Sequence, residues 1–510
     1  GSPMTTTSQP TGVDVQACLE KLRALRASGG DVRTRGLPDA VVQDFLGRDA
    51  TLARAIEEAS GAYDCLKLEM PEFLAADEVE QMAVAREGIT NFYPEDALNP
   101  YVPLAACGPW IVTAKGAVIH DSGGYGMLGL GHNPEPVLEA GARRQVMANV
   151  MTPSISQMRL VRALRKEIGR NRPGGCPFAR FVFMNSGSES VSVAARIADV
   201  NAKLLTDPGG RHAGKPIKRL TLDGGFHGRT LRPAQFSHST LATYKAHMAT
   251  FRDDEDLLFV APNDVPALEA LYARADEEGF FIEAFFMEPV MGEGNPGQGV
   301  DPAFYDAARR LTKAHGSILL MDSIQAGLRA HGCLSIVDYP GFEQSEAPDL
   351  ETYSKALNAG QYPLSVLALT EEAAALYRKG IYGNTMTAAP RAMDVGVATL
   401  EAITPEIRAN IRERGKEFTA LLEALQAETG GAITKVLGTG LLVQCQLDAK
   451  RYKSYGANST EEYMRERGIG VIHGGKNALR FTPHFRVTSD ELKMIVDAIR
   501  DALVNGPTIA

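Results

Sequence analysis

The chain has 510 residues, of which 44% are hydrophobic and 23% charged, and it carries a formal net charge of −9 at pH 7. This length permits a large buried core and predicts two or more domains, and the composition is typical of a globular protein and not of a disordered or fibrous one. The acidic balance gives no reason to expect nucleic acid or an anionic membrane as a partner, and no apolar run approaches the roughly 20 residues that span a bilayer.

The first 96 residues are predicted to be mainly helical. Gly1–Pro3 before Met4 is typical of an expression scar, and the polar stretch that follows is expected to be mobile. From about Val13 to Asp96, apolar residues recur at spacings of three and four with charges between them, which indicates amphipathic helices. Because this region has no catalytic signature, we interpret residues 1–96 as a helical extension that packs on the main body or on a second subunit.

Residues 97–150 are predicted to form an N-terminal segment that joins the small domain. This segment contains GYGMLG (Gly124–Gly129), which matches the GxGxxG pattern of dinucleotide sites. It lacks a clear preceding apolar strand and a well-placed ribose-binding acid, so it is weak evidence for such a site.

Between residues 151 and 391, short apolar runs alternate with amphipathic helical stretches. Four of these runs end in a polar turn that contains glycine: FARFVFMNSGSES, KRLTLDGGFHGRT, IEAFFMEPVMGEG and GSILLMDSIQAG. Strand, turn and helix repeated in this way predict an α/β domain whose mainly parallel sheet is flanked by helices on both faces. In such a sheet the ligand lies beyond the carboxyl ends of the strands, where all four turns are expected. Residues 392–510 are predicted to form a smaller α+β domain.

Three of these segments supply groups that together suit pyridoxal phosphate. NSGSES follows a buried strand and opens a helix, so the amides of Gly187 and Ser188 and the helix dipole suit a phosphate, although a serine N-cap alone would also explain the pattern. Asp322 ends another strand; taken singly, it would only cap a loop. Lys355 lies among small and apolar neighbours, which suits either a lysine that reaches the surface or one that takes part in chemistry. In combination, and with the aromatic turn GFHG, they are the parts that a pyridoxal phosphate site needs.

From about Pro100 to the C-terminus, the chain resembles the class III aminotransferases, which are fold type I pyridoxal phosphate enzymes. The matching blocks, in this order, are LGHNPEPV, NSGSES, GFHGRT, MEPVMGEG, MDSIQAG, PDLETYSKALNAGQYPLS and YGNTMTAAP. The resemblance implies transfer of an amino group from an amino acid to a keto acid or aldehyde. It implies that Lys355 forms the Schiff base with the cofactor and then moves the substrate α-proton, and that Asp322 keeps the pyridine nitrogen protonated.

The resemblance also implies the surroundings of the cofactor. Phe226 and Ile324 would lie on opposite faces of the ring and Gln325 near its hydroxyl group. Thr385 matches a threonine that reaches the phosphate of the neighbouring subunit, which implies a homodimer with active sites at its interface. His227 lies in a tight turn beside glycine, where a structural role is the simpler interpretation. The predicted cofactor-binding residues are Gly187, Ser188, Phe226, His227, Asp322, Ile324, Gln325, Lys355 and Thr385.

Three residues are predicted to contact the substrate. Arg480 matches the family arginine that commonly receives the α-carboxylate as a bidentate partner. Glu293 matches an acid that pairs with this arginine in some members, and Tyr125 is the third predicted contact. A surface ion pair and a loop carboxylate are the structural alternatives for Arg480 and Glu293.

Several positions depart from the family pattern. Ser323 follows Asp322 where an acid is usual, Ser192 replaces a frequent glutamate, and RAHG and AAP stand where GRTG and GNP are common. These changes bear on the reaction, because one scaffold of this kind supports several reactions. One alternative is therefore an eliminating or carbon–carbon bond-forming enzyme of alkaloid metabolism, acting on an amino acid with a γ leaving group such as S-adenosylmethionine and possibly coupling it to a nicotinamide nucleotide. Another is a non-catalytic binding protein, against which the intact Lys355 and Asp322 weigh.

The six cysteines lie far apart in the sequence and show no CxxC pair and no Cys/His spacing suited to zinc. We therefore expect no metal site and a reducing, cytoplasmic location.

Overall fold

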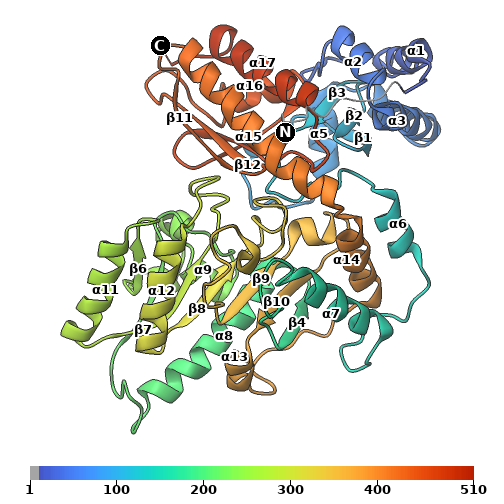
Figure 1. Cartoon of the computed structure of the whole chain (residues 1–510). Coiled ribbons are helices and arrows are strands. Elements are labelled where there is room, and N and C mark those ends of the chain that lie inside the picture. Colours follow the sequence, from blue (N-terminus) through green and yellow to red (C-terminus); the bar gives the residue numbers. More distant parts are fainter. Residues whose placement is uncertain (1–10, 510) are drawn as a thin grey trace. The chain divides into compact units, whose positions relative to one another are not determined.

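The computed structural model describes residues 11–509, which form two compact units (Figure 1). The first unit combines the chain up to Pro134 with the chain from Glu413 onward, and the second is Glu135–Arg412. The predicted expression scar, Gly1–Pro3, and most of the polar stretch that follows it lie outside the described residues. Across residues 11–509, no helix has both the length and the apolar composition that a membrane span requires.

The N-terminal part of the first unit is helical, as its apolar periodicity predicted. Asp49 caps the long helix α3, and its carboxylate also accepts a hydrogen bond of 2.9 Å from the indole nitrogen of Trp110. Because α3 packs on strands β1 and β2, the extension covers a sheet of its own unit. The elements are α1 (Val15–Arg26), α2 (Asp39–Leu46), α3 (Ala50–Glu69), α4 (Pro71–Ala75), α5 (Glu78–Arg86) and the 3₁₀ turn η1 (Glu95–Ala97).

Two four-stranded sheets complete the first unit. One has the strand order β1-β2-β3-β13 and the other the order β11-β12-β15-β14. Their strands are β1 (Pro103–Cys107), β2 (Trp110–Thr113), β3 (Val118–Asp121), β11 (Ile433–Thr439), β12 (Leu442–Leu447), β13 (Ile469–Gly470), β14 (Ile472–Gly474) and β15 (Ala478–Phe481). The helices α16 (Thr460–Glu466) and α17 (Ser489–Asn505) belong to this unit, and α15 (Pro405–Glu428) begins in the second unit and ends in the first.

A seven-stranded sheet of order β4-β10-β9-β8-β7-β5-β6 forms the centre of the second unit. β10 is antiparallel to both of its neighbours, β4 and β9, so these two run in the same direction as the parallel strands β5, β6, β7 and β8. The strands are β4 (Arg180–Met184), β5 (Ile217–Leu222), β6 (Leu257–Val260), β7 (Phe281–Met287), β8 (Ile318–Asp322), β9 (Leu350–Tyr353) and β10 (Ser365–Leu369). The predicted mainly parallel sheet is confirmed, with one reversed strand inside it.

Helices cover both faces of this sheet, because its central strands are apolar on both sides. α8 packs its small residues Ala194 and Ala198 in one core with Phe286 and Leu320. Phe285, next to Phe286 on the same strand, points to the opposite face of the sheet, where its ring contacts Phe304 of α12. The helices are α6 (Glu135–Ala142), α7 (Ile155–Glu167), α8 (Gly187–Thr206), α9 (Leu231–Gln235), α10 (Leu241–His247), α11 (Val265–Glu278), α12 (Pro302–His315), α13 (Glu371–Leu376) and α14 (Pro390–Ala402).

Candidate active site

The predicted site residues of the second unit follow the carboxyl ends of its sheet strands. α8 begins three residues after β4, the GFHG turn follows β5, and Asp322 is the last residue of β8. Lys355 comes two residues after β9. Since these strands run in one direction, their turns meet at one edge of the sheet, which is where a ligand binds in this kind of fold.

Asp322 is held by His227. Its carboxylate oxygen Oδ2 lies 2.8 Å from Nδ1 of His227, and its Oδ1 accepts the amide of Ile324 at 3.1 Å. Both side chains are buried, and Nε2 of His227 lies 3.2 Å from the hydroxyl of Thr221. A carboxylate that is bound on both oxygens has a fixed orientation, so His227 orients the aspartate that would meet the ring nitrogen.

The start of α8 forms a compact group with the turns after β5 and β8. Ser186 caps the helix, and Ile324 of the turn that follows Asp322 packs so closely on Gly187 that a side chain there would require Ile324 to move. The hydroxyl of Ser188 lies 2.5 Å from that of Thr230. Thr230 was missed by the sequence reasoning, although it ends the GFHGRT block. Helix amides with two hydroxyl groups are suitable donors for a phosphate.

A buried glutamate after β7 ties two other turns together. Glu288 accepts the amides of Phe226 at 3.2 Å and Gly292 at 3.0 Å, and a side chain at Gly292 would collide with Gln325. Burial raises the pKa of Glu288 to about 7. The sequence reasoning missed this residue, although it directly follows an apolar strand. It fixes the turn of Phe226 to the turn of Gly292, against which Gln325 packs.

Lys355 occupies an unusual backbone conformation. It is half-buried and has a φ of 48°, a left-handed conformation that costs a residue with a side chain about 1–3 kcal/mol unless its surroundings enforce it. The surroundings are fixed by hydrogen bonds. The hydroxyl of Ser354 and the side-chain amide of Asn358 both donate to the carbonyl of Leu364, at 2.8 and 2.9 Å. Strain that is held in this way is typical of functional positions.

Glu293 is half-buried in the loop that follows β7, and Thr385 lies on an exposed loop; both belong to the second unit. Glu293 is 4.0 Å from the guanidinium of Arg229, which itself lies 5.6 Å from the centre of the Phe226 ring. The two neighbours of Thr385 in the chain are bonded to the start of α8. The side chain of Asn384 donates to Glu189 at 2.8 Å. The carbonyl of Met386 accepts from the side chain of Asn185 at 2.6 Å.

Arg480 and Tyr125 lie in the first unit and contact each other. Arg480 extends from β15, is 2% exposed, and places its guanidinium carbon 5.4 Å from the centre of the Tyr125 ring. The rings of Tyr125 and Tyr93 stack at 5.6 Å. Burial raises the pKa of Tyr125, so its hydroxyl stays protonated at neutral pH. The two predicted substrate residues thus form one group, although 355 positions separate them.

Three metal-ligating side chains also meet in the first unit. Nε2 of His120 and Nε2 of His484 lie 2.9 and 2.7 Å from the same oxygen of Glu491, and all three side chains are buried. Burial acts to raise the pKa of Glu491, but the charges and hydrogen bonds of the two histidines outweigh it and lower this pKa to about 2. Hydrogen bonds to one ionised carboxylate account for this arrangement, and we assign it no metal.

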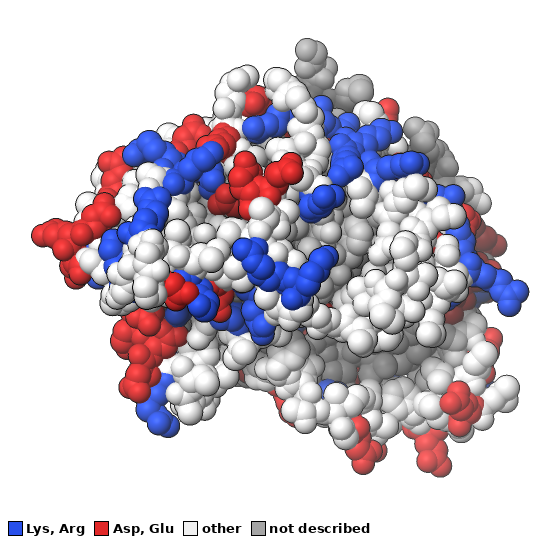
Figure 2. Space-filling view, turned by 90° about the horizontal axis from the view of Figure 1, so that it is seen from below, with Lys and Arg blue, Asp and Glu red and all other residues white. Residues whose placement is uncertain are grey.

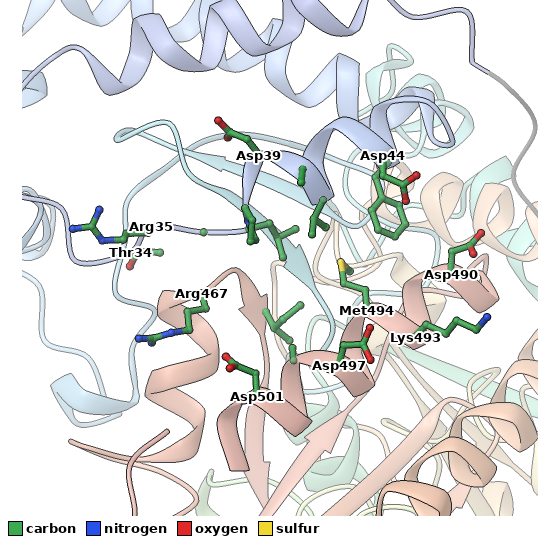
Figure 3. A pocket seen from close by; sticks show the side chains of 18 of the residues that line it. Thr34, Arg35, Asp39, Asp44, Arg467, Asp490, Lys493, Met494, Asp497 and Asp501 are labelled. Atoms are coloured by element: carbon green, nitrogen blue, oxygen red, sulfur yellow. The ribbon is translucent and has the colours of Figure 1, made fainter. Parts of the chain in front are cut away.

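A separate cavity of about 1120 Å³ lies in the first unit between residues near α2 and helix α17 (Figure 3). Its apolar wall includes Leu37, Phe45 and Met494, and charged side chains surround it. Among the described residues, those predicted for the active site do not line it. On the face of the molecule in Figure 2, basic and acidic side chains are interspersed, so this face carries no extended region of one sign.

The fold is that of the fold type I pyridoxal phosphate enzymes. A family model described as aminotransferase class-III matches residues 93–503, and the chain belongs to this family. The predicted family, cofactor and type of activity, amino-group transfer, are confirmed.

Relatives and solved structures agree with this assignment. The acetylornithine aminotransferase of Neisseria meningitidis serogroup B is 29% identical over 78% of this chain and 93% of its own length. The ornithine aminotransferase of Toxoplasma gondii ME49 has a TM-score of 0.71 at 21% identity and covers 86% of this chain and 98% of its own. A phospholyase from Arthrobacter, in complex with phosphoethanolamine, has a TM-score of 0.68 at 20% identity and covers 84% and 100%. The two structures share the fold, and the predicted alternative reaction on S-adenosylmethionine finds no support among these relatives.

Proposed function

We propose that this aminotransferase holds pyridoxal phosphate at the carboxyl edge of the seven-stranded sheet and acts on an amino acid and a keto acid or aldehyde. The observation that carries the proposal is the convergence of Asp322, His227 and the start of α8, with Lys355 following the neighbouring strand. We also propose a division into domains. Residues 151–391 form the large domain that carries the cofactor, and residues 392–510 form the small domain, which residues 97–150 join. Residues 1–96 are the N-terminal extension.

Each residue of this edge has a role that its chemistry suits. The cofactor, when bound, supplies an electron sink for the substrate carbon. Asp322, oriented by His227, would hold a proton on the ring nitrogen, and Lys355 would bind the cofactor through its amine with release of water and serve as the base for the α-proton. Ser188 and the amides of α8 bind the phosphate together with Thr230. Phe226 and Ile324 would flank the ring, and Gln325 would lie near its hydroxyl group.

We further propose that Arg480 binds the substrate α-carboxylate, with Tyr125 against its guanidinium and Glu293 as an acid at the substrate end. Because the related enzymes are named for ornithine and acetylornithine, amino acids with a second, terminal amine are the first donors to test. A cytoplasmic location is part of this proposal, since the free cysteines suit a reducing compartment.

The experiment is a single-turnover donor panel. Purified protein loaded with pyridoxal phosphate is mixed with glutamate, alanine, ornithine or acetylornithine, and the keto or aldehyde product is quantified. The proposal predicts one product molecule per site and recovery of the starting spectrum when a keto acid is added. A protein that no donor converts, but that releases the thioether from S-adenosylmethionine, would be an eliminating enzyme.

We propose a homodimer in which Thr385 reaches the phosphate of the partner's site. Lys355→Ala and Thr385→Ala chains, each poorly active alone, are expected to regain activity when mixed and re-assembled, because each mixed dimer then contains one site with both residues intact. The measurement is turnover before and after mixing, with sedimentation to follow the dimer. A monomer in solution, or mixing without any gain, would contradict the arrangement in trans.

A further inference from the structure

Glu351 is a buried carboxylate on β9, four residues before Lys355. It is fully buried, and in the sheet register Glu351 pairs with Met321 while Thr352 pairs with Asp322. It therefore lies one step along the ladder from the aspartate of the proposed site. A buried carboxylate is costly unless hydrogen bonds satisfy it, so its partners explain how the fold accommodates it.

Four donors surround this carboxylate. Its Oε2 accepts the hydroxyl of Ser323 at 2.7 Å and the amide of Ile336 at 3.0 Å. Its Oε1 accepts the hydroxyl of Tyr353 at 2.8 Å and that of Ser335. This is the full acceptor capacity of a carboxylate. Even so, burial raises the pKa of Glu351 to about 7.

One of these donors belongs to the turn that carries the proposed cofactor residues. Ser323 directly follows Asp322 and precedes Ile324, which packs on Gly187. Its backbone is fixed as well: its amide donates to Thr352 at 2.9 Å, and its carbonyl accepts from Gly327 at 2.8 Å. The bond to Glu351 is the side-chain bond of Ser323 itself, and it adds to those that Asp322 makes with His227 and Ile324.

We propose that Glu351 is a positioning residue for the cofactor, acting through Ser323. It connects the strand that leads to Lys355 with the turn that carries Asp322 and Ile324, so the lysine and the aspartate keep a fixed relation. Ser323 stands where an acid is usual in the family, and here its hydroxyl binds a carboxylate that comes from the neighbouring strand. This inference rests on the proposed function, because it assumes that Asp322 and Lys355 meet the cofactor.

The test compares Ser323→Ala with Ser335→Ala. Both substitutions remove one hydroxyl donor from the same buried carboxylate, but Ser335 lies outside the turn 322–325 and also caps the short turn η4 (Ile336–Asp338). The readouts are the melting temperature of the cofactor-free protein and the equilibrium dissociation constant for pyridoxal phosphate, followed by fluorescence.

We expect both variants to lose stability, with Ser335→Ala losing at least as much. Ser323→Ala should weaken cofactor binding about tenfold, as when one hydrogen bond to a charged group is lost, and Ser335→Ala by less than about twofold. Equal effects of the two variants on cofactor affinity would overturn the positioning role. If the unmodified protein itself binds no cofactor, the proposed function fails instead.

Glu351→Gln provides a second, conservative test. Its amide oxygen can keep the bonds from Ser323 and Ile336, and its amide nitrogen can donate to the hydroxyls of Ser335 and Tyr353, which can rotate to accept. We expect cofactor affinity within about threefold of the original, whereas Glu351→Leu, which leaves the Ser323 hydroxyl without an acceptor, should resemble or exceed Ser323→Ala. A glutamine variant as weak as the leucine variant would contradict the hydrogen-bond account.

Discussion

Lys355→Ala is expected to lower turnover by about 10⁴-fold or more, because the substitution removes both the nucleophile and the base of the proposed reaction. The structure gives a further reason to expect a large effect. The backbone at Lys355 is held in a left-handed conformation beside a turn in which Ser354 donates to the carbonyl of Leu364, and such enforced strain is typical of functional positions. The melting temperature should change little, since the side chain is only half-buried.

The measurement is steady-state turnover with the best donor of the panel, together with the spectrum of the purified variant. Lys379→Ala, which removes an exposed lysine of the same unit, is the matched control and should keep full activity. Turnover above about one hundredth of the original in the Lys355 variant would show that another group performs the chemistry.

Asp322→Asn is expected to lower turnover by about 10²- to 10³-fold while the cofactor still binds. Asparagine has nearly the same shape and keeps a carbonyl oxygen for the amide of Ile324, which Asp322 now binds at 3.1 Å. It carries no negative charge, so it cannot hold the ring nitrogen in its protonated state. The effect should therefore fall on the catalytic rate more than on cofactor affinity.

The control is Asp338→Asn, another buried aspartate of the second unit. Asp338 accepts the amides of Gly169 and Asn171, both at 2.8 Å, and it has a structural position outside the site. Its replacement should lower the melting temperature and leave the rate per folded site unchanged. If Asp322→Asn behaves like Asp338→Asn, with a loss of stability and a normal rate, the assignment of Asp322 is wrong.

The sequence predicted four strands of the sheet, β4, β5, β7 and β8, because each is a short apolar run that ends in a polar turn. The parallel strands β6 and β9 were not predicted, since neither carries this pattern. The reversed direction of β10 was not predicted, because a buried run such as SVLAL has the same pattern in either direction. Direction depends on pairing with strands that lie far away in the chain.

The residues that were missed are those whose partners lie far away in the chain. Glu288 binds the amide of Phe226, which is 62 positions earlier, and Thr230 meets Ser188 across 42 positions. A carboxylate directly after a buried strand indicates that a hydrogen-bond donor lies close to it. Which residue supplies this donor depends on the tertiary structure. Tyr125 and Arg480 were predicted independently of each other. Their contact joins residues that lie far apart in the chain, so it could be seen only in the structure.

The most direct test of the central claim is to locate the covalent bond to the cofactor. The protein is purified with pyridoxal phosphate, reduced with borohydride, digested and mapped by mass spectrometry, with the Lys355→Ala variant treated in parallel. The proposed site predicts one reduced cofactor per chain, on Lys355, and none in the variant. Reduced cofactor on a different lysine, or a protein that binds no cofactor, would contradict the account.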